Sequence, residues 1–210
     1  MPFRTLGLDS RILQAVQEAG YTEPTPIQSA AIPEIIAGSD LIGIAQTGTG
    51  KTAAFTLPML TRLARAIPAG TTGTTRGTRA LVLAPTRELA VQIEENVKAY
   101  AQHLPLSVAT IFGGVGERPQ IQALKAGTNL IIACPGRLID LMSQRYGDFS
   151  ALEYLVLDEA DRLLDLDFGP EIDKLLKVIP RERNTFLFSA TMTTKVAKLQ
   201  RASLTDPVKV

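Results

Sequence analysis

The stretch AQTGTGKT, residues Ala45–Thr52, decides the fold of this chain. It follows the short apolar run Leu41–Ile44 and precedes a segment with the helical apolar pattern of Phe55 to Leu63. A strand, a glycine-rich turn that ends in Lys-Thr, and a helix form the context that a phosphate-binding loop, or P-loop, requires. The strict pattern has glycine where Ala45 stands, and the plainer alternative is an ordinary glycine-rich turn. We take nucleotide phosphate binding as the working hypothesis.

Such a loop binds anions through its backbone. Gly48 and Gly50 accept conformations that a side chain forbids, so successive N–H groups can point inward at phosphate oxygens. The start of the following helix adds unpaired N–H groups and a positive dipole end. Lys51 would neutralise the outer phosphates, and the Thr52 hydroxyl would reach a Mg²⁺ ion. The nucleotide contacts predicted in this stretch are Gln46, Thr47, Gly48, Thr49, Gly50, Lys51 and Thr52.

The composition is that of an ordinary globular protein, with 210 residues of which 45% are apolar and 20% charged. A formal net charge of +1 gives no overall attraction to nucleic acid, so any such surface must be a local patch. The single cysteine, Cys134, excludes an internal disulfide and a multi-cysteine metal site. No apolar run approaches membrane-spanning length. We expect a cytoplasmic, monomeric domain with no membrane partner.

Short apolar runs alternate with helical patterns along the chain. The expected strands are Leu41–Ile44, Ala80–Ala84, Val108–Phe112, Leu130–Ala133, Tyr154–Leu157 and Thr185–Phe188. The expected helices between and after the later strands are Glu88–Gln102, Gln120–Lys125, Leu138–Gln144, Ile172–Val178 and Lys195–Arg201. Strands separated by helices predict an α/β fold, with a mostly parallel sheet covered by helices on both faces. The glycine- and threonine-rich residues 67–79 are predicted to form a flexible loop.

Polar residues, glycines and arginines follow the predicted strands, at the edge where ligands bind in parallel sheets. The strongest pair is Asp158-Glu159, directly after the apolar run Tyr154–Leu157. A carboxylate at this position, beside a P-loop, can hold Mg²⁺, often through water. Glu159 can then orient the attacking water. The plainer alternative for the pair is a solvated acidic strand end.

Gln28 has two competing interpretations. Thr25, Pro26 and Gln28 form the pattern of a helix start, in which the glutamine side chain completes a capping box. The amide also offers one donor and one acceptor, which match N6 and N7 of adenine and mismatch guanine. We expect that one side chain cannot perform both tasks well.

Taken together, the motifs resemble those of a known family. They are GYTEPTPIQ, AQTGTGKT, PTRELA, GG, PGR, DEAD and SAT, in this order. The set is similar to the first RecA-like domain of the DEAD-box ATP-dependent RNA helicases, and the likeness runs from Phe3 to the end of the chain. The stretch GGVGERPQIQALKAG, followed by PGRLIDL, is similar to the bacterial RhlE-like branch. The resemblance implies a RecA-like P-loop NTPase domain that uses ATP or ADP with Mg²⁺.

The resemblance assigns roles to matching positions around the nucleotide. Gln28 would read adenine within an adenine-recognition segment, residues 1–36, with Phe3 and Tyr21 near the base. Thr25 would brace the phosphate loop. The catalytic set would be Lys51, Asp158, Glu159, Ser189 and Thr191, with Thr52 and Asp158 at the metal. Ser189 and Thr191 would link the nucleotide to RNA binding, partly through Asp161, although without the resemblance they are equally well a strand end and a helix cap.

The resemblance also implies an RNA-binding rim that selects backbone shape and 2′-hydroxyls rather than sequence. Its residues would be Pro85, Thr86, Arg87, Gly113, Gly114, Pro135, Gly136 and Arg137. Glycines permit close backbone approach, and arginines can fork onto phosphates. Cys134 stands where the family usually has threonine, so a hydroxyl contact to RNA would be lost or weakened. Taken singly, each arginine is more often a solvated surface charge.

The second RecA-like domain of the family, with its arginine finger and half of the RNA surface, is absent from this chain. We therefore expect one domain, residues 1–210, that binds ATP or ADP with Mg²⁺ but hydrolyses ATP poorly and does not unwind duplexes alone. Joined to the second domain, it would couple ATP hydrolysis to local RNA unwinding. Two alternatives remain, a non-catalytic nucleotide-gated RNA clamp and a DNA-directed motor of the same fold. The RNA target and the cellular process are not encoded in recognisable motifs.

Overall fold

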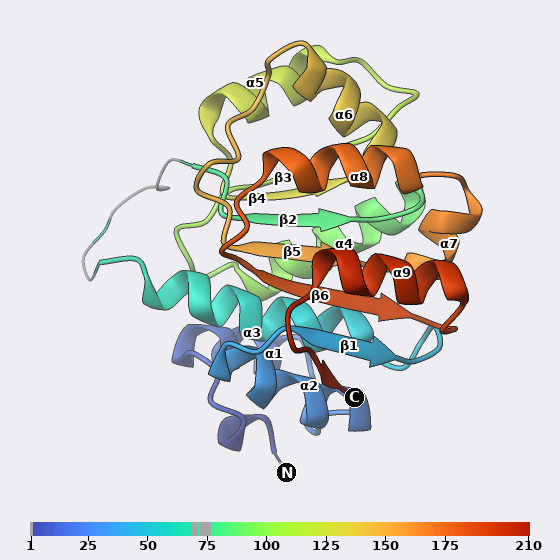
Figure 1. Ribbon diagram of the computed structural model, residues 1–210. Coiled ribbons are helices and arrows are strands. Elements are labelled where there is room, and N and C mark those ends of the chain that lie inside the picture. Colours follow the sequence, from blue (N-terminus) through green and yellow to red (C-terminus); the bar gives the residue numbers. More distant parts are fainter. Residues whose placement is uncertain (1, 69–70, 72–76) are drawn as a thin grey trace.

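A parallel β-sheet forms the centre of the molecule in the computed structural model, which describes residues 2–68, 71 and 77–210 (Figure 1). In the described residues the sheet has seven strands in the order β3-β4-β2-β5-β6-β1-β7, and every pair is parallel. The strands are β1 (Leu41–Ile44), β2 (Ala80–Leu83), β3 (Val108–Ile111), β4 (Leu130–Ala133), β5 (Tyr154–Leu157), β6 (Asn184–Ser189) and β7 (Val208–Lys209).

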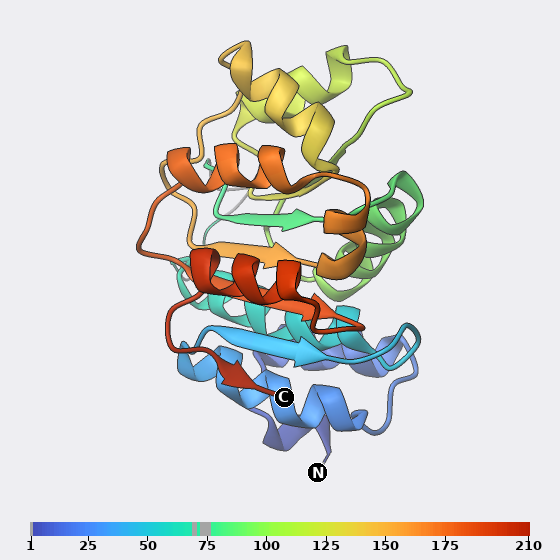
Figure 2. The same ribbon diagram turned by 45° about the vertical axis from the view of Figure 1, so that its right-hand side comes forward.

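Helices cover both faces of this sheet, as the sequence predicts (Figure 2). One face carries the short 3₁₀ helix η1 (Phe3–Thr5) with α1 (Ser10–Glu18), α2 (Pro26–Ala37), α3 (Lys51–Arg65) and α4 (Arg87–Tyr100). The other carries α5 (Arg118–Ala126), α6 (Pro135–Ser143), α7 (Ala160–Asp165), α8 (Gly169–Val178) and α9 (Thr194–Ser203). The strands β2, β4 and β5 are buried throughout, because both of their faces are covered. The predicted α/β fold is confirmed.

The parallel arrangement decides where the functional residues meet. The strand β6 lies between β1 and β5, and all three point the same way. The loop after β1 and the acidic pair after β5 therefore emerge at the same edge of the sheet, although more than a hundred residues separate them. Ligands bind at this edge in open parallel sheets.

Three helices begin earlier than the apolar pattern predicts. The helices α5, α6 and α8 start at Arg118, Pro135 and Gly169, and each has proline within its first two positions. Proline suits the first helical turn because its missing N–H would have no partner there. Apolar periodicity does not detect such a polar first turn. The short elements η1, α7 and β7 carry too few apolar residues to form a pattern, and the sequence reading missed them.

The predicted flexible loop, residues 67–79, includes Thr78 and Arg79, which belong to the folded domain. Residues 69–70 and 72–76 lie outside the described part of the chain. Thr78, however, is buried and donates its hydroxyl hydrogen to the Thr128 carbonyl at 2.7 Å. Arg79 forms an ion pair with Glu153, with Nε and Oε1 2.9 Å apart. Long-range polar contacts, which no local pattern reveals, bring these two residues into the folded body.

None of the helices in the described part of the chain has the length and apolar character that crossing a bilayer requires.

The buried carboxylate of Asp40 connects the segments that lead into β1, β6 and β7, which are neighbours in the sheet. Asp40, only 7% exposed, accepts hydrogen bonds on Oδ1 from the Thr185 backbone at 3.0 Å and from the Asn184 side chain at 3.2 Å. Its Oδ2 accepts from the Thr205 backbone at 2.8 Å. One side chain thus joins the start of β1, the start of β6 and the segment that leads to β7.

We predict that Asp40→Asn destabilises the domain by about 1–3 kcal/mol, because the amide NH₂ must face at least one backbone N–H donor that then has no acceptor. Urea-induced unfolding measures the change. The control is Asp206→Asn, an exposed residue in the left-handed region with φ of 42°, where asparagine is well tolerated. Equal free energies of unfolding for the two variants would show that the buried hydrogen bonds of Asp40 contribute no net stability.

Candidate functional site

The P-loop leads directly from β1 into α3. Gly48 and Gly50 have φ of 84° and 88°, in the left-handed region that glycine adopts without strain. Gly50 also lacks space for a side chain, since a Cβ there would lie 2.5 Å from Nε2 of Gln28. Residues 46–49 are exposed, whereas Lys51 is only 7% exposed at the start of α3. The backbone therefore has the form of an anion-binding turn ahead of a helix N-terminus.

Gln28 connects the start of α2 to this loop. Its Oε1 accepts from the Thr25 backbone N–H at 3.0 Å, and the Thr25 hydroxyl accepts from the Gln28 backbone, which completes the predicted capping box. Its Nε2 donates to the Gly50 carbonyl at 3.1 Å. An amide oxygen accepts two hydrogen bonds and an amide nitrogen donates two. One acceptor position and one donor therefore remain, so capping does not use up the amide, and base reading by Gln28 stays a prediction.

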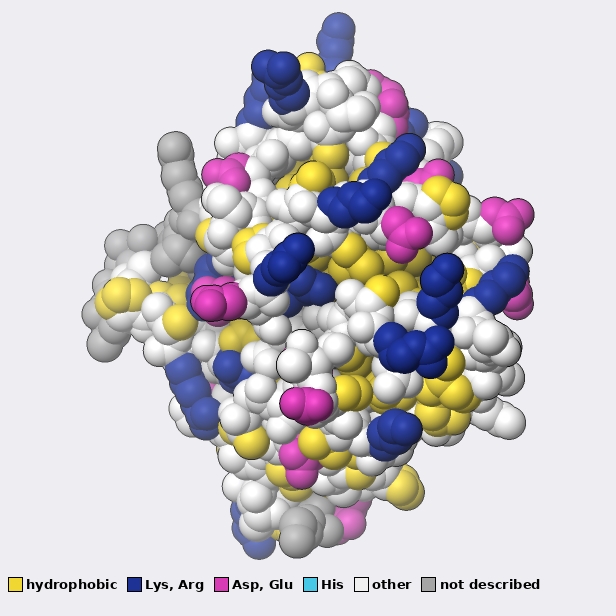
Figure 3. Space-filling model, viewed as in Figure 1, with side chains coloured by type: hydrophobic (Ala, Val, Ile, Leu, Met, Phe, Trp, Pro, Cys, Tyr) yellow, Lys and Arg dark blue, Asp and Glu magenta, His cyan; other side chains and the backbone are white. Residues whose placement is uncertain are grey.

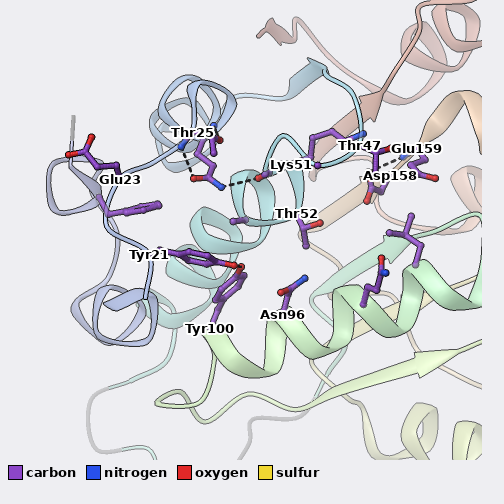
Figure 4. A pocket seen from close by; sticks show the side chains of 17 residues that line it. Tyr21, Glu23, Thr25, Thr47, Lys51, Thr52, Asn96, Tyr100, Asp158 and Glu159 are labelled. Atoms are coloured by element: carbon purple, nitrogen blue, oxygen red, sulfur yellow. Dashed lines mark hydrogen bonds between the residues drawn. The ribbon is translucent and has the colours of Figure 1, made fainter. Parts of the chain in front are cut away.

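A cavity of about 470 Å³ opens beside the P-loop (Figure 4). The predicted site residues that line it are Phe3, Tyr21, Thr25, Gln28, Thr47, Gly48, Gly50, Lys51, Thr52, Asp158 and Glu159. They come from η1, from the segment before α2, from the P-loop and from the end of β5. The cavity does not reach Gln46 or Thr49, and the Thr49 hydroxyl donates to the Gln46 carbonyl at 2.8 Å.

One wall of the cavity was missed by the sequence reading. The helix α4 contributes Leu89, Gln92, Asn96 and Tyr100, which recur every three or four residues and so share one face. Figure 4 shows Tyr100 beside Tyr21, and their hydroxyl oxygens are 3.3 Å apart. Glu23 and Ala53 complete the lining. The helical spacing was visible in the sequence, but only the packing of α4 against α3 shows that this face borders the P-loop.

The acidic pair lies at the end of β5, where Asp158 is 2% exposed and Glu159 lines the cavity. Burial raises the pKa of Asp158 to about 6, and the nearby Lys51 charge partly opposes this rise. Glu159 has a φ of 48°, an uncommon value for a residue with a side chain. Its backbone N–H donates to Oδ1 of Asp158 at 2.9 Å. Strained backbone of this kind is concentrated at functional sites.

Ser189 and Thr191 contact the acidic segment from the neighbouring strand β6. The Thr191 hydroxyl and backbone N–H both donate to Oδ2 of Asp161, at 2.9 Å and 3.1 Å. The Ser189 hydroxyl accepts from the Asp161 backbone at 3.2 Å. Burial alone would raise the pKa of Asp161, but these hydrogen bonds hold the pKa below its ordinary value. Neither residue is among those that line the cavity.

The predicted RNA rim follows β2, β3 and β4. The guanidinium carbon of Arg87 lies 5.2 Å from the centre of the Phe112 ring, and Nη1 of Arg137 donates to the Val115 carbonyl at 3.2 Å. Both arginines thus contact the segment that contains the exposed Gly113 and Gly114. They also belong to the first turns of α4 and α6, where unpaired N–H groups face outward.

The other rim residues differ in burial and in hydrogen bonding, and their RNA contacts stay a prediction. Pro85 and Pro135 are buried, so their side chains shape the turns instead of lining a surface. The Thr86 hydroxyl is used as the cap of α4, accepting from the Leu89 backbone at 3.2 Å. Gly136 is exposed in the first turn of α6. Cys134 is the N-cap residue of α6, and its side chain makes no capping hydrogen bond. A threonine hydroxyl at an N-cap makes such a bond well.

The Cys134 thiol has a pKa raised to about 11, first by burial and second by the nearby Glu88 carboxylate. Because only the thiolate reacts, we predict alkylation by iodoacetamide at pH 8 that is about 100-fold slower than for a thiol of pKa about 9. The rate should keep rising as the pH approaches 11. The same reaction in urea is the control, since unfolding removes both causes. Equal rates in folded and unfolded protein would contradict the assigned environment.

Comparisons with known proteins place this site in a family. Residues 25–199 match the family model described as DEAD/DEAH box helicase. The ATP-dependent rRNA helicase RRP3 of Meyerozyma guilliermondii is 50% identical over 209 residues, which cover 99% of this chain and 42% of that protein. The human probable ATP-dependent RNA helicase DDX47 is 50% identical over 208 residues, 99% of this chain and 44% of that protein. This chain spans less than half of these curated relatives.

A solved structure supports the same family assignment. The crystal structure of a DEAD box protein from the hyperthermophile Methanococcus jannaschii superposes with a TM-score of 0.90 at 31% identity, over 100% of this chain and 55% of that one. The likeness to the bacterial RhlE-like branch stays a prediction. The P-loop, the acidic pair behind it and the match over residues 25–199 agree, and the chain belongs to the DEAD/DEAH box helicase family as a RecA-like domain.

Proposed function

We propose that this domain binds ATP or ADP with Mg²⁺ in the cavity beside the P-loop and presents half of an RNA-binding surface along the neighbouring rim. The observation that carries the proposal is the cavity itself, whose lining brings Lys51 and Thr52 together with Asp158 and Glu159. Backbone amides and a lysine suit a triphosphate, and the carboxylates suit a metal ion and a water molecule. Binding of ATP with Mg²⁺, measured by calorimetry, tests it.

The residues present fit Mg²⁺ as P-loop proteins hold it. No cluster of three or more histidine, cysteine or acidic residues able to hold a metal occurs in the described chain. Mg²⁺ requires no such cage, because it keeps several waters and takes one or two protein ligands plus phosphate oxygens. Thr52 and Asp158 would hold it, and the ion would neutralise charge on the phosphates. A nearby cation would also favour the charged form of Asp158, which burial disfavours.

The chain's own groups would position the reaction. Lys51 and the backbone N–H groups of the P-loop would hold the terminal phosphate, and Glu159 would accept a hydrogen bond from the attacking water and take up its proton. Positioning and charge neutralisation, rather than covalent chemistry, account for most of the catalysis in phosphoryl transfer. Asp161, bonded to Thr191, connects this pair to β6. That contact is a direct route by which hydrolysis can be coupled to movement against a second domain.

Adenine would lie at the end of the cavity formed by Gln28, Phe3 and Tyr21. The remaining acceptor position and donor of Gln28 match N6 and N7 of adenine, and the ring of Tyr21 offers a stacking surface. Because Gln28 also donates to the Gly50 carbonyl, base recognition and the P-loop share one side chain.

RNA would follow the rim formed by Arg87, Gly113, Gly114, Gly136 and Arg137. The first turns of α4 and α6 and the two arginines provide phosphate contacts, which position RNA without reading its sequence. The whole protein would join this domain to a second RecA-like domain that supplies an arginine finger, and closure of both would couple ATP hydrolysis to local RNA unwinding. A cytoplasmic location and a monomeric state of this domain belong to the same proposal.

We predict that Gln28→Ala weakens ATP binding by about tenfold or more and abolishes preference for ATP over GTP, because both base-directed hydrogen bonds are lost. Gln28→Glu is the matched comparison. Its carboxylate still accepts from the Thr25 N–H but cannot donate to adenine N7 or to the Gly50 carbonyl. Calorimetric titration with both nucleotides measures the effect. Unchanged selectivity in Gln28→Ala would remove this residue from base recognition.

We predict that this chain alone turns over ATP about 10³–10⁵-fold more slowly than the RNA-stimulated two-domain protein, which gains the arginine finger. In the two-domain protein, Glu159→Gln should leave ATP binding intact and lower turnover by about 100-fold or more. RNA should stimulate turnover, and DNA of the same sequence with deoxyuridine in place of thymidine should not, because it lacks the 2′-hydroxyls. Fast turnover by the isolated chain, or equal stimulation by DNA, would contradict the mechanism.

A further inference from the structure

A groove runs between α8 and α9, on the face of the sheet opposite α3 and α4 (Figure 3). It contains one cavity of about 580 Å³ near the carboxyl ends of the two helices and one of about 200 Å³ nearer their starts. The floor is aliphatic and is formed by Leu164, Leu176, Ile179, Leu199 and Leu204. In Figure 3 this floor is the yellow surface between dark-blue side chains. Neither the nucleotide cavity nor the predicted RNA rim includes these residues.

The edges of the groove are strongly basic. Lys177, Arg181, Arg183, Lys195, Lys198 and Arg201 line it, and Asp173 is the only acidic residue that does so in the described chain. Residues 169–205 contain seven lysines and arginines against three acidic residues, in a chain whose totals are 22 and 21. The near-neutral net charge of the protein therefore conceals a basic face.

Arg183 has a role in the fold, because its guanidinium donates to the Pro180 and Ser203 carbonyls at 2.7 Å and 3.3 Å. In the described part of the chain, no such contact explains the other five cations. Within the described residues, no ion pair joins any of them to a carboxylate. Lys177 and Arg201 lie in the last turns of their helices, where cations favour the helix dipole. Lys195 lies in the first turn of α9, where the dipole disfavours a cation, and Lys198 lies in the middle of the helix, where the dipole gives it no support. Unpaired like charges repel one another, so their gathering around an apolar floor points to an external partner.

We propose that this groove binds an acidic segment of a partner protein whose apolar side chains cover the aliphatic floor. The basic edges match the charge of such a segment, and the leucines match its apolar residues. An RNA strand would match the charge only: no aromatic ring lines the groove for its bases to stack on, so it would leave the aliphatic floor uncovered. The helices α8 and α9 have ten residues each, so a helical segment of about ten residues, about 15 Å long, spans the groove.

The test uses this chain and three fluorescein-labelled probes of about ten residues or nucleotides each. They are a peptide of glutamate with leucine at helical spacing, a polyglutamate peptide of equal charge, and a single-stranded RNA. The groove variant is Lys198→Glu with Arg201→Glu, and the matched control is Arg145→Glu with Lys209→Glu. All four positions are exposed, the two variants have the same net charge, and none of the residues contributes to the nucleotide site.

We expect the leucine-containing peptide to bind more tightly than polyglutamate, with an affinity that falls as salt rises. The groove variant should weaken this binding by about tenfold or more, and the control should change it by less than about twofold. Circular dichroism and urea-induced unfolding of both variants check that they are folded. Equal binding of both peptides, equal loss in both variants, or no binding of the leucine peptide would overturn the proposal. A groove variant that loses RNA but not peptide would assign the surface to nucleic acid instead.

This inference is independent of the proposed nucleotide site. A domain that binds ATP but not the peptide would retain its proposed function, and the reverse result would leave the groove assignment intact.

Discussion

The structure depends on the parallel direction of its strands. Because every paired strand in the described chain runs the same way, the P-loop after β1, the acidic pair after β5 and the rim residues after β2, β3 and β4 all emerge at one edge. Each strand is only a few residues long and apolar, so the covering helices provide most of its stability. The functional residues at this edge are thus positioned by a hydrophobic core to which they do not belong.

Gln28 shows how one side chain can belong to both the fold and the site. Its amide oxygen accepts from the Thr25 N–H in the cap of α2, and its amide nitrogen donates to the Gly50 carbonyl. The residue after Gly50 is the buried Lys51. The start of α2, the P-loop and the part of the cavity lined by Gln28 are therefore directly connected. Such sharing is possible because an amide has two acceptor positions and two donors, and the cap and the loop use one of each.

Charge is arranged locally rather than globally. A net charge of +1 in the whole chain coexists with buried Asp158 beside Lys51, with arginines on the rim, and with the basic groove between α8 and α9. Electrostatic attraction falls off within about 10 Å at an ionic strength of about 0.1 M. A binding partner therefore responds to these local patches and not to the net charge of the chain.

The sequence by itself determined the strands β1 to β6, most of the helices, the P-loop and the acidic pair, because these are local patterns of apolar spacing and glycine placement. It missed η1, α7 and β7, and it placed the starts of α5, α6 and α8 too late, because their first turns carry no apolar periodicity. Only the tertiary structure decided that α4 forms a wall of the cavity, that Pro85 and Pro135 are buried, and that Thr78 and Arg79 bind Thr128 and Glu153. These contacts join residues far apart in the chain, and packing of the two helical layers on one sheet creates them.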